Sequence, residues 1–94
     1  MFVSKAEYRV KADFAQRNMA NIKAFMPLAL ERLAPGSSYS VSVSEDGLSF
    51  LHLYFHEAAG DVMMLGEIPA FHHFLSEVME GCEAPPSMTT FTEI

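Results

Sequence analysis

The sequence predicts an α+β fold in which two helices cover one face of a four-stranded antiparallel sheet. Hydrophobic and polar residues alternate in four segments, which is the period of a half-buried strand. In two further segments hydrophobic residues recur every three or four positions, which is the period of a helix. Half of the 94 residues are hydrophobic, enough to fill one core. We therefore expect a single domain over residues 1–94.

Residues 2–11 form the first expected strand. Ala6, Tyr8 and Val10 point to one side of this strand, and Lys5 and Glu7 point to the other. One face of the strand is therefore suited to a core, and the opposite face is charged.

Residues 12–33 follow with a helical period. Asp13 is a residue type that caps helix N-termini, and Gln16 three residues later completes a capping-box pattern. Pro35 and Gly36 end the segment. An apolar stripe runs along one side of the helix and consists of Ala15, Met19, Ile22, Phe25, Met26, Ala29 and Leu33.

The dipeptide Asp46-Gly47 separates the two central strand segments and is a signal for a two-residue hairpin turn. A turn at these residues fixes the register of the hairpin, so that Val43 faces Phe50. The pairs that follow are Val41–His52, Tyr39–Tyr54, Ser42–Leu51, Ser40–Leu53 and Ser38–Phe55. One face of the hairpin is therefore bulky, and the other combines serine with leucine and phenylalanine.

Residues 57–66 form a connection, and residues 69–81 form the second expected helix, because proline suits a first helical position. Residues 88–94 alternate again and form the last strand. The apolar side of the second helix consists of Phe71, Phe74, Leu75, Val78 and Cys82. The order β-α-β-β-α-β is that of the ferredoxin-like fold, in which the helices cover only one face of the sheet.

The uncovered face of this sheet carries an unusual stripe of serine. Ser38, Ser40 and Ser42 share it with Leu51 and Leu53, which makes the face too apolar for plain solvent contact and too polar for a core. Small serine side chains allow a second sheet to approach closely. We therefore expect a homodimer through this face; the alternative is an ordinary solvent-exposed face.

The composition excludes several classes of partner. The formal net charge is −6 and the six Lys and Arg residues do not cluster, which argues against nucleic acid and anionic membrane surfaces. No apolar segment reaches the length of a membrane span, and charged residues interrupt the N-terminal segment, so we expect no signal peptide. The single cysteine, Cys82, has no internal disulfide partner, so a cytoplasmic location is expected.

His52 is the candidate catalytic residue, because it lies in the middle of a strand on the bulky face. The ordinary pKa of histidine lies near neutral pH, so a neutral imidazole can accept a proton from a phenol or enol. Tyr54 lies about 7 Å along the same face and is placed to orient a substrate oxygen. The alternative is a core histidine with satisfied hydrogen bonds. His56 lies about 13 Å from His52 along the strand, so the two cannot share a metal ion. We expect no metal.

Four segments of the chain together resemble the antibiotic-biosynthesis monooxygenase-like proteins, which are dimeric α+β barrels. The segments are YRVKADFAQRN (8–18), APGSSYSV (34–41), EDGLSFLHL (45–53) and LGEIPAFHHFLSEVMEGCEAPP (65–86). The resemblance is closest to an uncharacterised branch of that family. It implies a homodimer whose two sheets close into a barrel, with a pocket in each protomer between sheet and helices. We expect Tyr8, Tyr39, Phe50 and His72 to contact a ligand there.

The resemblance also implies an activity. Some relatives are cofactor-independent monooxygenases that use Trp, Asn, Arg and Tyr around a polycyclic phenol, and the haem-degrading relatives use an Asn, a Trp and a helical His. This chain has no Trp, and His52-Leu53-Tyr54 stands where the family often has Glu-x-Trp. We therefore expect a small aromatic ligand, no cofactor, and His52 and Tyr54 as catalytic residues. The alternatives are a non-catalytic binding or assembly module and an isomerase-type proton transfer on the same fold.

Overall fold

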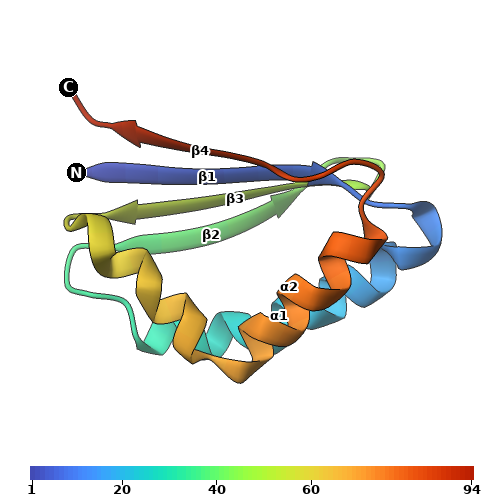
Figure 1. Cartoon of the computed structure of the whole chain (residues 1–94), viewed down its shortest axis with the longest axis horizontal. Coiled ribbons are helices and arrows are strands. Elements are labelled where there is room, and N and C mark those ends of the chain that lie inside the picture. Colours follow the sequence, from blue (N-terminus) through green and yellow to red (C-terminus); the bar gives the residue numbers. More distant parts are fainter.

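The computed structural model describes all 94 residues and confirms the predicted ferredoxin-like order of strands and helices. The strands are β1 (Phe2–Arg9), β2 (Ser38–Val43), β3 (Ser49–His56) and β4 (Ser87–Thr92). The α-helices are α1 (Ala15–Glu31) and α2 (Pro69–Gly81), and the 3-10 helices η1 (Ala12–Phe14) and η2 (Ala59–Glu67) precede them. The sheet is antiparallel in the order β2-β3-β1-β4, and both α-helices lie on one of its faces (Figure 1).

The hairpin of β2 and β3 has the predicted register, since Val43 pairs with Phe50. The turn differs from the prediction. The amide of Gly47 donates to the carbonyl of Ser44 across 2.9 Å, and Gly47, with φ 78°, is the only turn residue of positive φ. A two-residue turn of the expected kind needs positive φ at its first central residue, and Asp46 lacks it. The carboxylate of Asp46 instead accepts a hydrogen bond from the amide of Leu48 at 3.0 Å, within a wider loop.

The capping box predicted for Asp13 and Gln16 is wrong. Neither η1 nor α1 has a side-chain cap, and α1 begins only at Ala15. In η1 the amide of Phe14 donates to the carbonyl of Lys11 across 2.9 Å. Such tight backbone hydrogen bonds satisfy part of the free amides at the start of the helix, so no side-chain acceptor is required there.

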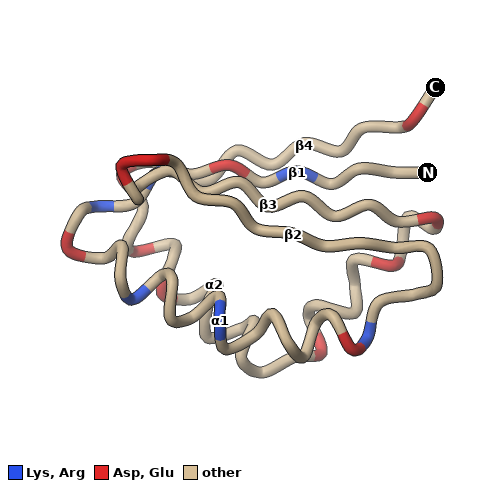
Figure 2. The backbone as a smooth tube through the Cα atoms, turned by 180° about the vertical axis from the view of Figure 1, so that it is seen from behind, with Lys and Arg blue, Asp and Glu red and all other residues tan.

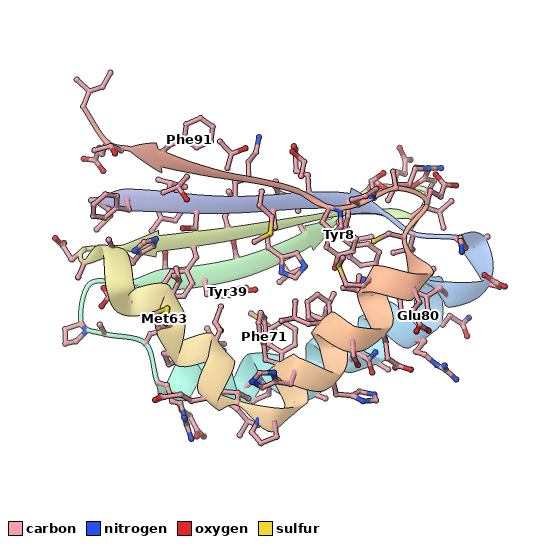
Figure 3. The ribbon with its side chains drawn as sticks, viewed as in Figure 1. Tyr8, Tyr39, Met63, Phe71, Glu80 and Phe91 are labelled. Carbon is pink, nitrogen blue, oxygen red and sulfur yellow. The ribbon has the colours of Figure 1, made fainter.

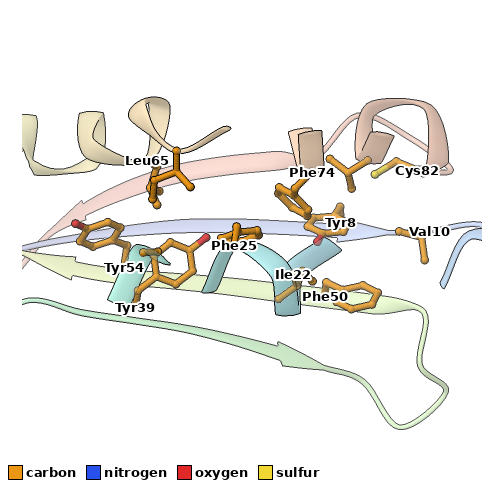
Figure 4. Packing of buried hydrophobic residues seen from close by; sticks show 13 residues of the cluster. Tyr8, Val10, Ile22, Phe25, Tyr39, Phe50, Tyr54, Leu65, Phe74 and Cys82 are labelled. Atoms are coloured by element: carbon orange, nitrogen blue, oxygen red, sulfur yellow. The ribbon is translucent and has the colours of Figure 1, made fainter. Parts of the chain in front are cut away.

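The core lies between the sheet and the two α-helices (Figure 4). The alternation is clearest in β3, where Phe50, His52, Tyr54 and His56 are buried and the residues between them are half-buried. Phe25 of α1 contacts both main aromatic residues of α2, with ring centroids 5.0 Å from Phe71 and 4.9 Å from Phe74. The four buried polar side chains are Asn18, Asn21, His52 and His56. Burying a polar group costs free energy unless the group is hydrogen-bonded. The hydrogen-bond partners of these four side chains therefore show where polar groups meet inside the core.

The outer face of the sheet, which points away from the helices, is not covered by any other part of the chain (Figure 1). Neither β2 nor β3 contains a Lys, Arg, Asp or Glu (Figure 2). The ammonium group of Lys5 lies 5.7 Å from the ring centroid of Phe91, which Figure 3 shows on this side of β4. The predicted serine stripe of Ser38, Ser40 and Ser42 is exposed on this face, beside half-buried Leu51, Leu53 and Phe55.

Candidate functional site

A cavity of about 280 Å³ lies between the sheet and the segments η2 and α2. Its sheet side is formed by Tyr8, Tyr39, His52 and Tyr54, and its helical side by Val62, Leu65, Phe71 and Phe74. In Figure 3, Tyr8 and Tyr39 extend from the sheet toward the helices, and Phe71 extends toward them from α2. Met79 and Met88 also line the cavity and are 60% and 80% exposed, so the cavity opens to solvent between α2 and β4.

A second hollow, of about 380 Å³, lies where α1 and α2 meet η1. It is lined mainly by charged side chains, among them Arg17, Glu77 and Glu80. Arg17 and Glu77 form an ion pair at 3.3 Å, and Asn21 donates to Glu77 at 2.8 Å. These groups satisfy one another, so the apolar cavity is the better candidate for a ligand site.

His52 is the centre of a hydrogen-bonded chain at the base of the apolar cavity. Its Nε2 lies 2.8 Å from the hydroxyl of Tyr8, and its Nδ1 lies 2.9 Å from the hydroxyl of Tyr39. Asn18 of α1 donates from Nδ2 to the same Tyr8 hydroxyl at 3.0 Å. The imidazole is thereby held from both sides, and the chain runs from the first helix to the cavity wall.

The three ionisable side chains in this hydrogen-bonded series, Tyr8, His52 and Tyr39, are all neutral at neutral pH. Burial lowers the pKa of His52 to about 4. Burial likewise raises the pKa of Tyr8 and of Tyr39 well above the ordinary value for a tyrosine. The site therefore offers hydrogen bonds without a fixed charge.

The structure brings together only some of the residues expected at the site. Tyr54 lines the cavity, but its hydroxyl donates to the carbonyl of Asp61 at 3.4 Å and so points to η2. Phe50 does not line the cavity, because its ring stacks on Tyr8 with centroids 5.4 Å apart and is covered by it. His72 is exposed outside the cavity, and its ring bonds the backbone carbonyl of Gly66.

A second buried histidine, His56, is hydrogen-bonded to a residue that lines the cavity. His56 is buried; its Nδ1 donates to the carbonyl of Ala58 at 2.8 Å, and its Nε2 lies 2.9 Å from the hydroxyl oxygen of Ser4. Ser4 lines the cavity. The rings of Phe2 and Tyr54 pack against the imidazole, with centroids at 5.6 and 5.1 Å.

Sequence reasoning missed Asn18 and Ser4. Asn18 is 0% exposed and lies one helical turn before Ile22, on the stripe that contains Ala15 and Phe25. A polar residue at a core position of an amphipathic helix was the available signal, because such a residue requires an internal partner. Ser4 lies on the inward face of β1 between Phe2 and Ala6, and residue spacing alone does not predict its hydrogen-bond partner on β3.

Neither a family model nor a curated protein sequence matches this chain. Solved structures do. A protein from Nitrosomonas europaea grouped with the antibiotic biosynthesis monooxygenases has a TM-score of 0.85 at 14% identity, over 100% of this chain and 99% of that chain. Rv0793 from Mycobacterium tuberculosis has a TM-score of 0.82 at 16% identity, over 99% and 94%. An antibiotic biosynthesis monooxygenase crystal structure has a TM-score of 0.85 at 8% identity, over 100% and 99%.

These comparisons define the class of fold. The chain is a ferredoxin-like α+β protein, and it has the fold of antibiotic biosynthesis monooxygenase-like proteins over its whole length. The resemblance seen in the sequence is therefore confirmed for the fold. At such low identities the likeness concerns the fold, and the chemistry must be argued from the cavity of this chain.

Two further observations describe what the fold contains. No group of three or more His, Cys, Asp or Glu side chains comes together in a way that would hold a metal ion. Neither α-helix combines the length and the apolar character that crossing a membrane requires.

Proposed function

We propose that the protein binds a small, flat, largely apolar molecule in the cavity, with one oxygen atom of that molecule at the hydroxyl of Tyr39. The observation that carries the proposal is the neutral chain of Tyr8, His52 and Tyr39 at the base of an otherwise apolar cavity. Ligand sites typically combine apolar walls with a few polar groups that orient the ligand. A volume of about 280 Å³ suits a molecule of one or two fused rings.

The proposed reaction is that of a cofactor-independent monooxygenase on a phenol or enol. Hydrogen bonding at Tyr39 stabilises the substrate anion, whose electron-rich ring carbon reacts with O₂. A carbon–oxygen bond forms to give a ring hydroperoxide, and loss of water leaves a quinone, so one phenol and one O₂ give one quinone and one water. The reaction class is proposed by analogy with proteins of the same fold that are described as antibiotic biosynthesis monooxygenases, and the neutral hydrogen-bonded residues of the cavity are compatible with it.

His52 acts in this proposal through Tyr39. A phenol has a pKa of about 10, so its transfer of a proton to a histidine of pKa about 4 is uphill by about 6 pKa units, or about 8 kcal/mol. That cost is too high for His52 to be the final proton acceptor. The proton therefore leaves through the open mouth of the cavity, and His52 holds Tyr39 in place while Tyr54 contributes its ring to the wall.

The proposed assembly is a homodimer through the outer face of the sheet, which carries Ser38, Ser40, Ser42, Leu51 and Leu53. Strands β2 and β3 support it, because they carry no Lys, Arg, Asp or Glu, so two copies can meet over this half of the face without burying a charge. The charged side chains of the face, Lys5, Glu7 and Arg9, lie on β1. Half-buried leucines beside small serines also give a surface that a second sheet can approach closely. Native mass spectrometry of the purified protein tests this assembly.

The test of the function uses 1,5-dihydroxynaphthalene, a flat phenol whose oxygenation gives the coloured quinone juglone. We expect the wild-type protein to bind the phenol, to consume O₂ and to form juglone faster than buffer alone, without added metal. The Tyr39→Phe variant should lose most of this rate, whereas Lys23→Ala, on the exposed side of α1, should retain it. Absence of binding by the folded protein would contradict the proposal.

A binding module without catalysis is the second candidate. The observation in its favour is that both ring nitrogens of His52 are already hydrogen-bonded and its pKa is low, which suits recognition better than proton transfer. Binding of the phenol with no O₂ consumption above the buffer rate would favour this candidate over the oxygenase.

A further inference from the structure

We propose that Asn18 is a positioning residue that fixes the direction of the hydrogen bonds at the site, so that Tyr39 presents its O–H to the cavity. The ligand is then one that offers a hydrogen-bond acceptor there: a carbonyl, quinone, enolate or phenolate oxygen. This inference rests on the proposed ligand site, and it adds the polarity of the group that the site recognises.

The first step concerns Tyr8, whose hydroxyl lies between two nitrogen atoms. Nδ2 of Asn18 is 3.0 Å away and Nε2 of His52 is 2.8 Å away. An amide nitrogen can only donate, so the hydroxyl oxygen of Tyr8 accepts from Asn18. The hydroxyl proton of Tyr8 is then free to be donated to Nε2 of His52.

The second step concerns the imidazole. A neutral imidazole has one donor and one acceptor nitrogen, and burial keeps His52 neutral. Since Nε2 accepts from Tyr8, the ring proton is on Nδ1. The Nδ1–H group therefore donates to the hydroxyl oxygen of Tyr39, which lies 2.9 Å away.

The third step concerns Tyr39. Its hydroxyl oxygen accepts from His52, so its own proton is not used in that bond. The structure gives this hydroxyl no other protein partner, and Tyr39 lines the cavity. The free O–H is therefore available to a ligand, and it is the donor end of the whole chain.

The fourth step explains why Asn18 decides the direction. Asn18 is 0% exposed, and its other polar atom, Oδ1, is buried without a partner. If the Asn18 amide were reversed, its Oδ1 would accept a hydrogen bond from the hydroxyl of Tyr8. Nε2–H of His52 would then donate to the oxygen of Tyr8, and the hydroxyl of Tyr39 would donate its proton to Nδ1 of His52. The cavity would then be offered only an oxygen lone pair, and it would select hydrogen-bond donors instead.

A buried, unpaired amide oxygen is uncommon in folded proteins, so that of Asn18 calls for a specific explanation. Asn21 provides the contrast on the same helix. It is also buried, but it donates to Glu77 on α2 and has no bond to Tyr8, His52 or Tyr39. Substitutions at Asn18 and at Asn21 both remove a buried amide, but only the substitution at Asn18 removes the hydrogen bond that orients Tyr8. Comparing the two variants therefore distinguishes these effects.

The experiment is long-range ¹H–¹⁵N NMR of the wild-type protein, with the ring signals of His52 assigned through its backbone. The expected spectrum is that of the Nδ1–H tautomer. Asn18→Leu should let the Nε2–H tautomer appear, whereas Asn21→Leu should leave the wild-type pattern. An Nε2–H tautomer in the wild type, or an unchanged tautomer in folded Asn18→Leu, would overturn the inference. The wild-type spectrum decides the direction even if a variant does not fold.

Ligand selection is tested with two bicyclic probes of similar size. 1-Indanone has a carbonyl acceptor and no donor, and indole has an N–H donor and no strong acceptor. The wild type should bind 1-indanone about tenfold more tightly than indole, and Asn18→Leu should reduce this preference. Equal or tighter binding of indole by the wild type refutes the proposed polarity. If neither probe binds, the proposed ligand site fails, while the NMR result still decides the direction of the hydrogen bonds.

Discussion

Acidification from about pH 7.5 to about pH 5 is expected to destabilise the protein through His52 before the carboxylates are protonated. His52 is 6% exposed, and burial lowers its pKa in the folded state to about 4, against 6.5 in a model peptide. Above pH 6.5 both states carry a neutral ring, so this stability is fully present. Below that value the unfolded chain binds a proton that the folded chain does not bind, so stability falls with pH.

The size of the effect follows from the two pKa values. Each pH unit between them changes the free energy of unfolding by about 1.4 kcal/mol. The loss attributable to His52 is therefore about 2 kcal/mol at pH 5 and about 3 kcal/mol at pH 4. The hydrogen bond from Ser44 lowers the pKa of Asp46, and the one from Asn21 lowers that of Glu77. The stability that these two carboxylates contribute is lost only as the pH falls through the range in which carboxylates are protonated.

Urea denaturation at several pH values and one protein concentration measures this slope. The matched variant is His52→Gln, because glutamine keeps a donor and an acceptor for Tyr8 and Tyr39 but does not titrate. The wild type should lose about 2 kcal/mol more than His52→Gln between pH 7.5 and 5. Parallel stability curves for the two proteins over this range would refute a neutral, buried His52.

Three further outcomes are expected. Tyr39→Phe should weaken binding of 1-indanone about tenfold in a fluorescence or NMR titration, with a loss of stability of about 1 kcal/mol; unchanged affinity would remove Tyr39 from the site. Leu51→Glu should turn the proposed dimer into a folded monomer in light scattering, because it places a second carboxylate directly beside that of Glu7 on the outer face, where the interface would have to bury both; a dimer that tolerates it would have to use another surface. Gly81→Ala should cost about 1–3 kcal/mol in urea denaturation, because the added methyl group would overlap the ring of Phe14. Gly60→Ala, in open space, is its control, and equal effects of the two changes would contradict that packing.

The register of the sheet could be predicted because it depends on short-range information. The alternation of hydrophobic and polar residues on both sides of Asp46-Gly47 determines which residues pair. The pairing is as predicted even though the turn is formed by a hydrogen bond from the amide of Gly47 to the carbonyl of Ser44. The wider loop leaves the same residues opposite one another. The start of α1 was less predictable, because Asp13 offers a capping side chain while the backbone forms η1 instead.

The site was only partly predictable. Period two places Tyr39, His52 and Tyr54 on one face of the sheet, and the structure places them there. The direction of individual hydroxyl groups depends on tertiary partners, so Tyr54 bonds Asp61 instead of facing a ligand oxygen. The contact between Asn18 and Tyr8 joins a helix to a strand through the interior, and no spacing rule within one element reports it.

The strand β4 has a consequence for the handling of this protein. It is an edge of the sheet, every residue from Ser87 to Thr92 is exposed, and none of them is charged or proline. An edge of this kind offers unpaired backbone groups that a strand of another molecule can join, which is the usual first step of aggregation. Glu93 lies directly after the strand and carries a negative charge. We expect this charge to oppose the addition of a second strand, so Glu93→Gln should shorten the time in which concentrated protein stays in solution.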